Sequence, residues 1–205
     1  MTKYFKHKTA EIGKKAKIGE GSKVWQNSII LDGAVLGKNC NIGHNCFIEG
    51  RAKLGNGVKL KSNIDVWDLV ILEDYVFVGP SAVFTNDKNP RAKYPKAKNP
   101  KFGKLIETFV REGVTIGANA TIICGITIGK WAMVGAGAVV REDVSDYSIV
   151  VGSPAKTIGF ICECGNKLNF ENNNRTECKI CKRKFKKENA AKGEPRQRRE
   201  KVKEI

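Results

Sequence analysis

Large apolar residues recur at every sixth position through the first part of the chain. The series has thirteen members without a gap: Ile12, Ile18, Val24, Ile30, Leu36, Ile42, Ile48, Leu54, Leu60, Val66, Leu72, Val78 and Phe84. The residue two positions before each member is small or β-branched, and none is charged. An α-helix turns every ~3.6 residues and a strand alternates every ~2, so neither keeps a period of six on one face.

A period of six fits a repeating unit of one short strand and one tight turn. Each unit then sends one large and one small side chain inward, and stacked units bury a continuous apolar column. With three units to a coil, the sequence predicts a mainly β fold, a parallel β-helix with three sides. A glycine follows several of the apolar positions, and we expect it to occupy a turn position of positive φ. These glycines are Gly13, Gly19, Gly37, Gly43, Gly55 and Gly79.

The period breaks once and resumes in a new frame. The second series is Ile116, Ile122, Ile128, Val134 and Val140, and it starts 32 residues after Phe84, which is not a multiple of six. Residues 85–113 are therefore expected to leave the column as an excursion. The segment is polar and basic and contains three prolines. Long loops in compact repeat domains are often functional, so we expect this one to border the active site.

Three polar residues lie where the excursion begins: Asp68, Asn86 and Asp87. Asp68 and Asn86 are three hexads apart, so a three-sided coil places one above the other. Such a cluster suits acyl transfer to an amine, because a carboxylate can hold the ammonium and accept its proton. The amide can orient the nucleophile or stabilise oxyanion charge. The alternative is structural: Asn86-Asp87 opens a turn and Asp68 is a solvated surface residue.

The small number of histidines argues against two other kinds of enzyme chemistry. The chain has only His7 and His44, too few for the three zinc ligands of a hexapeptide-repeat carbonic anhydrase. The excursion contains no histidine, which disfavours acyltransferases that use a loop histidine as base.

Two stretches of the sequence resemble a known enzyme family. VFVGPSAVFTNDKNPRA and the later segment with GANATI and VVGSPA are similar to nucleotide-sugar 3-N-acetyltransferases, within the hexapeptide-repeat acyltransferases. The resemblance covers roughly residues 7 to 170. It implies a left-handed β-helix that uses acetyl-CoA to acetylate the 3-amino group of a UDP- or dTDP-linked amino sugar for surface glycans. It also implies a homotrimer with active sites between subunits. Another amine or a hydroxyl acceptor remains an alternative.

The resemblance also implies roles for individual residues. Asn86 and Asp87 match the family motif, and Asp68 stands where an acidic residue helps to hold the sugar amine. Relatives usually carry tyrosine-glutamate-glycine there, whereas this chain has Trp67-Asp68-Leu69. Arg91 is a candidate for the substrate's phosphates or a sugar carboxylate. For the cofactor, small residues suggest that the backbone N–H groups around Ala118 and Ala136 meet the pantetheine arm, with Lys156 at a CoA phosphate.

Four of the seven cysteines fall in two hooks near the C-terminus. Cys162 and Cys164 form the first hook, and Cys178 and Cys181 form the second, with thirteen residues between the two hooks. Four thiolates at this spacing predict a closed, structural zinc site in a zinc-ribbon-like module. A degenerate or redox-active pair is the alternative. We therefore expect a β-helix domain at 1–159, the module at 160–187, and a basic tail at 188–205 that is a solvated helix or disordered.

The net charge and the lack of long apolar runs indicate which partners and which cellular location to expect. The 205 residues carry a net charge of +16, which favours anionic partners such as phosphate-bearing cofactors, nucleotide sugars or nucleic acid. A zinc-ribbon nucleic-acid binder on an inert column is thus the rival from another class, although the tail lacks the interleaved aromatic residues of a single-strand binder. No apolar run is long enough to span a membrane and the N-terminus lacks a signal-peptide pattern, so a cytoplasmic location is expected.

Overall fold

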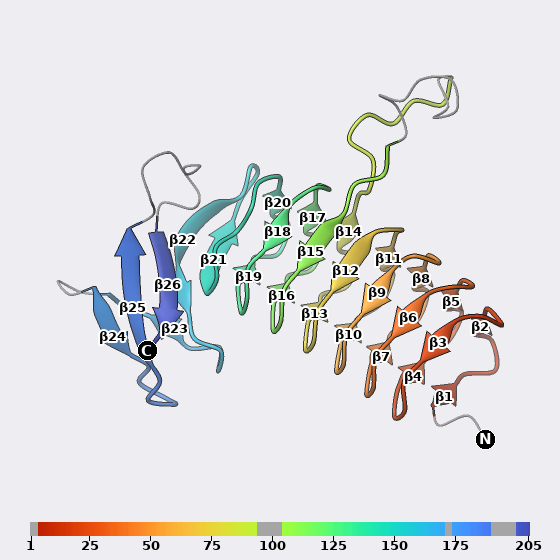
Figure 1. Cartoon of the computed structure of the whole chain (residues 1–205), viewed down its shortest axis with the longest axis horizontal. Helices are drawn as coiled ribbons and strands as arrows, with labels where there is room; N and C mark the ends of the chain where they lie inside the picture. The colour runs from red at the N-terminus through yellow and green to blue at the C-terminus, as the bar shows by residue number, and fades with distance from the viewer. Residues whose placement is uncertain (1–3, 94–103, 171–173, 190–199) are drawn as a thin grey trace.

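The computed structural model describes residues 4–93, 104–170, 174–189 and 200–205. Figure 1 shows a long column of stacked coils with a loop projecting from its side and a small sheet at the C-terminal end. The column is the left-handed parallel β-helix that the sequence predicts, with three faces of short parallel strands. In the described ranges no helix is long and apolar enough to cross a membrane.

Each face of the column collects every third strand. The first face contains β1 (Phe5–Lys6), β4 (Lys23–Val24), β7 (Asn41–Ile42), β10 (Lys59–Leu60), β13 (Phe77–Val78), β16 (Thr115–Ile116), β19 (Met133–Val134) and β21 (Ser148–Val151). The second face contains β2 (Glu11–Ile12), β5 (Ile29–Ile30), β8 (Phe47–Ile48), β11 (Asp65–Val66), β14 (Val83–Phe84), β17 (Thr121–Ile122) and β20 (Val139–Val140). The third face contains β3 (Lys17–Ile18), β6 (Val35–Leu36), β9 (Lys53–Leu54), β12 (Val70–Leu72), β15 (Thr108–Val110) and β18 (Thr127–Ile128).

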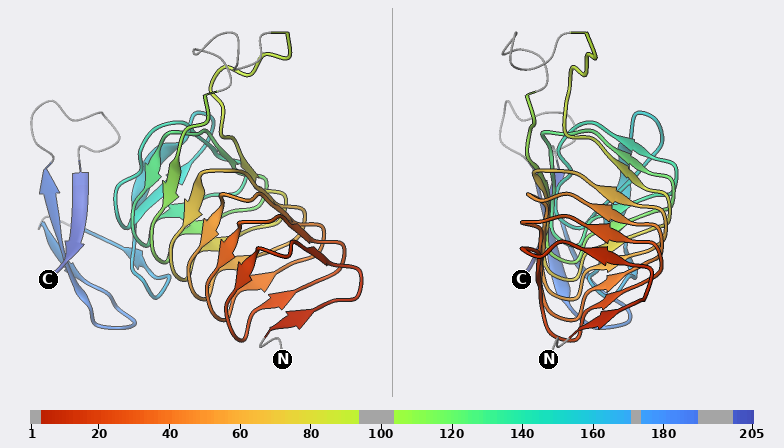
Figure 2. Two further views of the ribbon diagram at one scale, coloured as in Figure 1. Left: turned by 45° about the vertical axis from the view of Figure 1, so that its right-hand side comes forward. Right: turned by 90° about the vertical axis from the view of Figure 1, so that its right-hand side faces the viewer.

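Three rows of turns join the faces. We call the row between the first and second faces corner 1, the row between the second and third faces corner 2, and the row between the third and first faces corner 3. Corner 2 is the row from which the loop departs, because the loop follows β14 and precedes β15. Figure 2 shows this departure from two further directions.

The column interior holds the residues that the period of six selects. From Val24 to Phe84 every large member of the series is buried, whereas Ile12 and Ile18 at the open N-terminal end are only partly covered. Two buried serines occupy small inward positions and bond to the backbone. Ser28 Oγ donates to the Gly43 carbonyl at 2.6 Å and accepts from Cys46 N at 3.1 Å. These serines thus find partners within the column, as burial requires, whereas the buried hydroxyls of Ser145 and Ser148 near its C-terminal end have none among the described residues.

The glycines after the apolar positions have a different role from the one expected. None of the six has a positive φ, which falls two residues later in five of the six turns, for example at Asn39 and Gly57. A side chain at Gly37 would instead meet the carbonyl carbon of Gly55, 2.6 Å away on the next coil. Glycine is required there because successive coils approach too closely for a Cβ atom.

The excursion is shorter than the range 85–113 expected from the sequence. The chain rejoins the column at β15, where Val110 pairs in register with Leu72. Val110 therefore begins the second apolar series, one hexad before Ile116. The sequence hid this hexad because its small inward residue is Thr108, whose hydroxyl is fully buried in a position otherwise mostly occupied by apolar residues.

The C-terminal end departs from the parallel pattern. β22 (Lys156–Ile161) runs antiparallel to β21, and β23 (Lys167–Leu168) pairs with β22, so both extend the first face. A separate sheet contains β24 (Arg175–Glu177), β25 (Lys184–Asn189) and β26 (Glu200–Glu204).

The tail is therefore more ordered than predicted over its last residues. β26 pairs with β25 instead of forming a solvated helix or a disordered end, and residues 190–199 lie outside the described ranges. Val202 explains the order, since it is 3% exposed and packs with Phe185 in a small second core.

Replacing Ile122 by alanine should lower the free energy of unfolding by about 2–5 kcal/mol, because it leaves a cavity between two stacked coils. Ile122 is fully buried, whereas Ile158 is 58% exposed and provides the control. Urea titration followed by circular dichroism measures both variants. We expect Ile158→Ala to change stability by no more than about 0.5 kcal/mol. Equal effects of the two substitutions would contradict the placement of the core.

Candidate functional site

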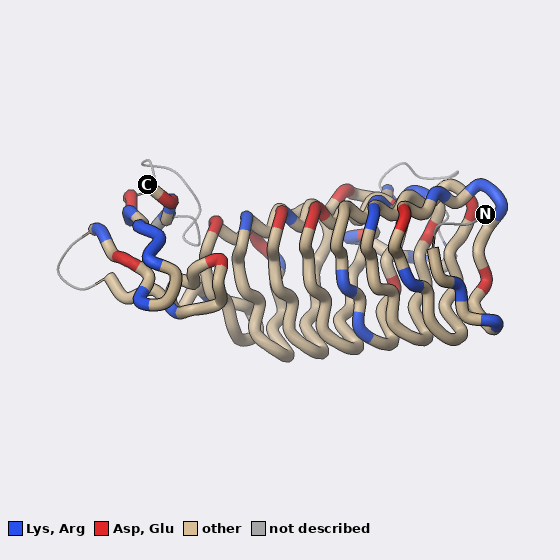
Figure 3. Tube along the Cα trace, turned by 90° about the horizontal axis from the view of Figure 1, so that it is seen from below, with Lys and Arg blue, Asp and Glu red and all other residues tan. Residues whose placement is uncertain are grey.

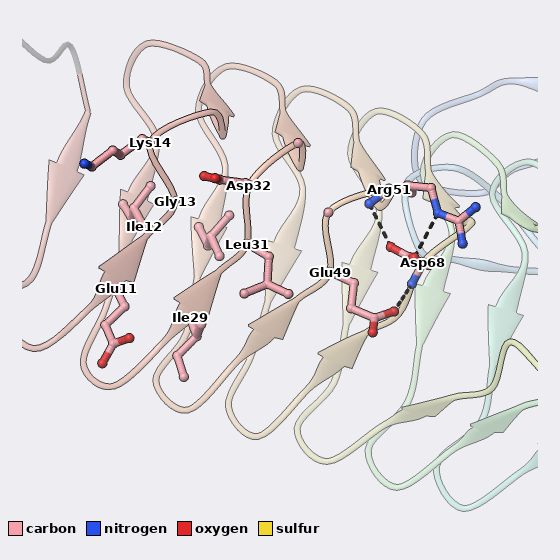
Figure 4. Close-up of a pocket in the computed structure, with 13 residues that line it drawn as sticks. Glu11, Ile12, Gly13, Lys14, Ile29, Leu31, Asp32, Glu49, Arg51 and Asp68 are labelled. Atoms are coloured by element: carbon pink, nitrogen blue, oxygen red, sulfur yellow. Dashed lines mark hydrogen bonds and ion pairs between the residues drawn. The ribbon is translucent and has the colours of Figure 1, made fainter.

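A groove of about 890 Å³ runs along corner 2 on the N-terminal side of the loop. Its apolar wall includes Ile12, Ile29 and Leu31, and Leu31 is 39% exposed. Charged side chains from four successive turns line the rest (Figure 4): Glu11, Lys14, Asp32, Glu49, Arg51 and Asp68. The groove thus ends at the residues that the sequence places below the loop.

Asp68 has both carboxylate oxygens engaged by Arg51. Oδ1 accepts from the Arg51 backbone N at 2.8 Å, and Oδ2 accepts from Arg51 Nε at 2.9 Å. The Asp68 N–H in turn donates to Glu49 Oε2. Asp32 and Asp74 accept in the same way from backbone N–H groups one coil below. Asp68 therefore caps a turn, which is a structural contribution that the sequence alone did not distinguish from a catalytic one.

Asn86 lies directly above Asp68, as the spacing of eighteen residues predicts. Its Nδ2 donates to the Asp68 carbonyl at 3.4 Å, a long hydrogen bond. Its own carbonyl accepts from Ile106 N at 2.9 Å, which joins the outgoing and returning strands of the loop. Asn86 is thereby held at the point where the loop leaves the column.

Asp87 opens a turn at the same point. Its Oδ1 accepts from Asn89 N at 2.8 Å, and its backbone forms an antiparallel bridge with Leu105. This is the turn anticipated by the structural alternative. Oδ2 has no hydrogen-bond partner among the described residues, so one carboxylate oxygen remains available for a ligand.

Two threonines that the sequence analysis did not single out fasten the loop to the column. Thr85 Oγ1 accepts from Cys124 N at 2.9 Å, and Thr108 Oγ1 accepts from Gly125 N at 3.2 Å. The two ends of the loop are thus attached to adjacent amides of one turn. The signal was a threonine near each end of the break in period, but the range 85–113 assigned to the excursion included both.

Arg91 is not brought to this cluster. It is exposed, and among the described residues its only hydrogen bond is from Nη1 to the Pro90 carbonyl at 2.8 Å. Its expected contact with substrate stays a prediction.

Ala118, Ala136 and Lys156 lie along corner 1. A Cβ on Gly79 would meet Ala118 N at 2.6 Å, and Gly117 lies against Ala136 in the same way, so these turns stack. Within the described part of the chain neither the Ala118 nor the Ala136 N–H has a hydrogen-bond partner. Lys156 is exposed and pairs with Val151, which covers Gly135 at the end of this corner.

The candidate donor and acceptor residues therefore occupy different corners of the column. Asn86 and Asp87 lie on corner 2, and the unpartnered amides lie on corner 1, with the second face between them. A single chain does not bring the two sets together.

The four C-terminal cysteines do meet. Their Sγ atoms all lie within 4.8 Å of one another, with Cys162 and Cys181 at 3.3 Å and Cys164 and Cys178 at 3.5 Å. Tetrahedral zinc with Zn–S bonds of about 2.3 Å separates its sulfur ligands by about 3.8 Å. The cluster therefore fits a closed tetrathiolate site.

Two of these thiols have a lowered pKa, in contrast to the buried thiol of Cys46 in the column. Burial opposes ionisation of Cys178, but hydrogen bonds from the backbone N–H groups of Cys181 and Ile180 outweigh it and lower the pKa to about 6. The backbone N–H of Arg183 lowers the pKa of Cys181, whereas burial raises the pKa of Cys162. In the column, burial raises the pKa of Cys46 to about 11, so that thiol stays protonated.

Comparison with known proteins agrees with this architecture. Residues 15–50 and 107–142 match the family model described as bacterial transferase hexapeptide (six repeats), and the second match begins where the column resumes. A mutant of AntD, an N-acyltransferase from Bacillus cereus, in complex with dTDP and coenzyme A, is similar with a TM-score of 0.50 and 19% identity. The similarity covers 77% of this chain and 82% of that one, and shows the fold. The two matched ranges identify the stacked coils as hexapeptide repeats of the bacterial transferase type.

Within that class, two curated relatives are informative. The dTDP-3-amino-3,6-dideoxy-alpha-D-galactopyranose 3-N-acetyltransferase of Aneurinibacillus thermoaerophilus is 46% identical over 76 residues, which are 37% of this chain and 39% of that protein. Serine acetyltransferase 4 of Arabidopsis thaliana is 32% identical over 117 residues, which are 57% of this chain and 28% of that protein. The chain thus spans less than two thirds of the length of each relative.

Substituting valine for Thr108 should destabilise the protein by about 1–3 kcal/mol, because the Gly125 N–H loses its acceptor inside the column. Serine at the same position keeps the oxygen and is the matched control, with an expected cost below about 1 kcal/mol. Urea unfolding gives the stability, and amide hydrogen exchange of Gly125 reports the local bond. Equal protection of Gly125 in both variants would show that the hydroxyl contributes nothing.

Proposed function

We propose that the protein is an acetyl-CoA-dependent N-acetyltransferase that acts on the 3-amino group of a nucleotide-linked amino sugar. The observation that carries this proposal is the placement of Asn86 and Asp87 at the base of the loop, above a groove of ligand size. The 46% identical segment shared with a dTDP-amino-sugar 3-N-acetyltransferase supports the same substrate class. The product would be an acetamido sugar for surface glycan synthesis.

The proposed reaction requires the protein mainly to orient the reactants and to accept a proton. The neutral amine attacks the thioester carbonyl, a C–N bond forms, the C–S bond breaks, and the departing thiolate takes up the amine's proton. Asp87 Oδ2 is available to hold the ammonium and receive its proton before attack. Among the described residues, Asn86 Nδ2 makes only a long bond to the Asp68 carbonyl, so it can turn to the acceptor or to the developing oxyanion.

A complete site requires neighbouring chains in this proposal. The unpartnered N–H groups of Ala118 and Ala136 form a row that an extended pantetheine arm can follow, with Lys156 at its end for a CoA phosphate. Because this row lies on a different corner from Asn86 and Asp87, corner 1 of one subunit must face corner 2 of the next. A closed homotrimer satisfies this arrangement three times. In this proposal the reaction takes place in the cytoplasm.

Nucleic-acid binding is less well supported as the main activity. Figure 3 shows basic and acidic residues interspersed along the turns and the C-terminal sheet. Several cations of that sheet are already paired, including Lys203 with Glu188 at 2.7 Å and Arg183 with Glu163 at 3.5 Å. These pairs reduce the charge available for phosphate contacts.

Asn86→Ala and Asp87→Ala should each reduce turnover by about 10²-fold or more, because each removes a group that orients the acceptor or its proton. Release of free CoA thiol is followed with acetyl-CoA and a panel of UDP- and dTDP-3-amino sugars. Asp74→Asn is the control, since Asp74 caps a turn on corner 3 as Asp68 does on corner 2.

The panel also distinguishes the competing acceptors. Thiol release with another amine or with a hydroxyl acceptor alone would replace the amino sugar in the proposal. No release with any acceptor would remove acetyl transfer altogether. Wild-type rates in both loop variants would leave the enzyme without this active centre.

A further inference from the structure

The two cysteine hooks belong to two different sheets. Cys162 and Cys164 lie in the turn between β22 and β23, which continue the hydrogen-bonded first face of the column. Cys178 and Cys181 lie in the turn between β24 and β25, in the separate three-stranded sheet. Among the described strands no ladder joins these two sheets. The cysteine cluster therefore stands at the junction between the column and its C-terminal sheet.

Both hooks have the tight turns that a metal site needs. Gly165 N donates to the Cys162 carbonyl at 2.8 Å, and Lys182 N donates to the Cys178 carbonyl at 3.0 Å. Gly165 has a φ of 86° and Lys182 a φ of 63°, so each hook reverses within a few residues. Each of the two closest sulfur pairs joins one hook to the other, Cys162 with Cys181 and Cys164 with Cys178. The four sulfurs thus converge on one point between the sheets.

The apolar contacts at this junction are few. Within the described ranges, the second core contains six buried residues: Phe160, Cys162, Leu168, Cys178, Phe185 and Val202. Its main link to the column is Tyr147 of the last corner-3 turn, whose ring lies 5.3 Å from that of Phe185. A core of this size does not hold residues 160–205 in place by itself, and small domains usually add a metal or disulfides.

We propose that the four thiolates of Cys162, Cys164, Cys178 and Cys181 bind one zinc ion, which ties the three-stranded sheet to the end of the column. Four protein ligands complete the coordination, so the metal is structural and takes no part in acetyl transfer. By holding the module in place, it stabilises β22 and β23 over β21. Those strands cover what would otherwise be an exposed edge of the first face.

The first measurement is the metal content of the full-length protein purified without chelators. Elemental analysis should give about one zinc per chain. Cys164→Ser with Cys178→Ser should lower it by at least about tenfold, whereas Cys124→Ser, at a buried thiol in the column, should leave it unchanged. Co²⁺ substituted into the wild-type protein should show the strong absorption of a tetrahedral thiolate site. The Co²⁺ spectrum of the wild-type protein tests the metal site even if the double variant does not fold.

The second measurement tests whether the metal holds the three-stranded sheet to the end of the column. Removal of the metal from the wild-type chain by a chelator should expose residues 160–205 to trypsin while the column stays resistant, and added Zn²⁺ should restore protection. If residues 160–205 stay protected from trypsin after the metal is removed, the metal does not hold the sheet to the column. Absence of zinc, with disulfides joining Cys162 to Cys181 and Cys164 to Cys178 in non-reducing mass spectrometry, would overturn the metal site. Neither result depends on the proposed acetyl transfer, whose failure would appear only in the thiol-release assay.

Discussion

Parallel hydrogen bonding between strands eighteen residues apart is the interaction on which this structure depends. Asp65 in β11 pairs with Phe47 below and with Val83 above, and the same relation repeats along the second face. Because each strand of this face contributes only two residues, the register leaves no freedom, and a slip of one residue would turn an inward side chain outward. The stacking therefore fixes the core, the close approach of the turns, and the vertical alignment of Asp68 with Asn86.

Much of this follows from the sequence, because a period of six has few structural solutions. The faces, the core and the register of Asp68 with Asn86 were predictable from spacing alone. The return of the chain at Thr108 was not, since a buried threonine that bonds to Gly125 N looks like a loop residue in the sequence. The order of Val202 was hidden for a similar reason: its charged segment has large apolar residues only at Val202 and Ile205, which give no periodicity.

The sequence predicts which residues of the candidate site lie together, but not which of their polar atoms are already engaged in hydrogen bonds. Spacing places Asp68 below Asn86, yet only the structure shows that Arg51 occupies both oxygens of the Asp68 carboxylate. Spacing likewise gives the stacked turns of Ala118 and Ala136, but not the corner they share. That corner is what separates the proposed cofactor row from Asn86 and Asp87, and it makes contact between subunits a geometric requirement of the proposed reaction.

The attachment of the loop has a consequence for how such a protein diversifies. Thr85 and Thr108 bind adjacent amides of one turn, and Asn86 and Ile106 close the base just outside them. Everything beyond this base can change in length or sequence without altering the spacing of the coils. A lineage carrying this fold can therefore exchange the arm that leaves the column one coil above the groove while inheriting the scaffold intact.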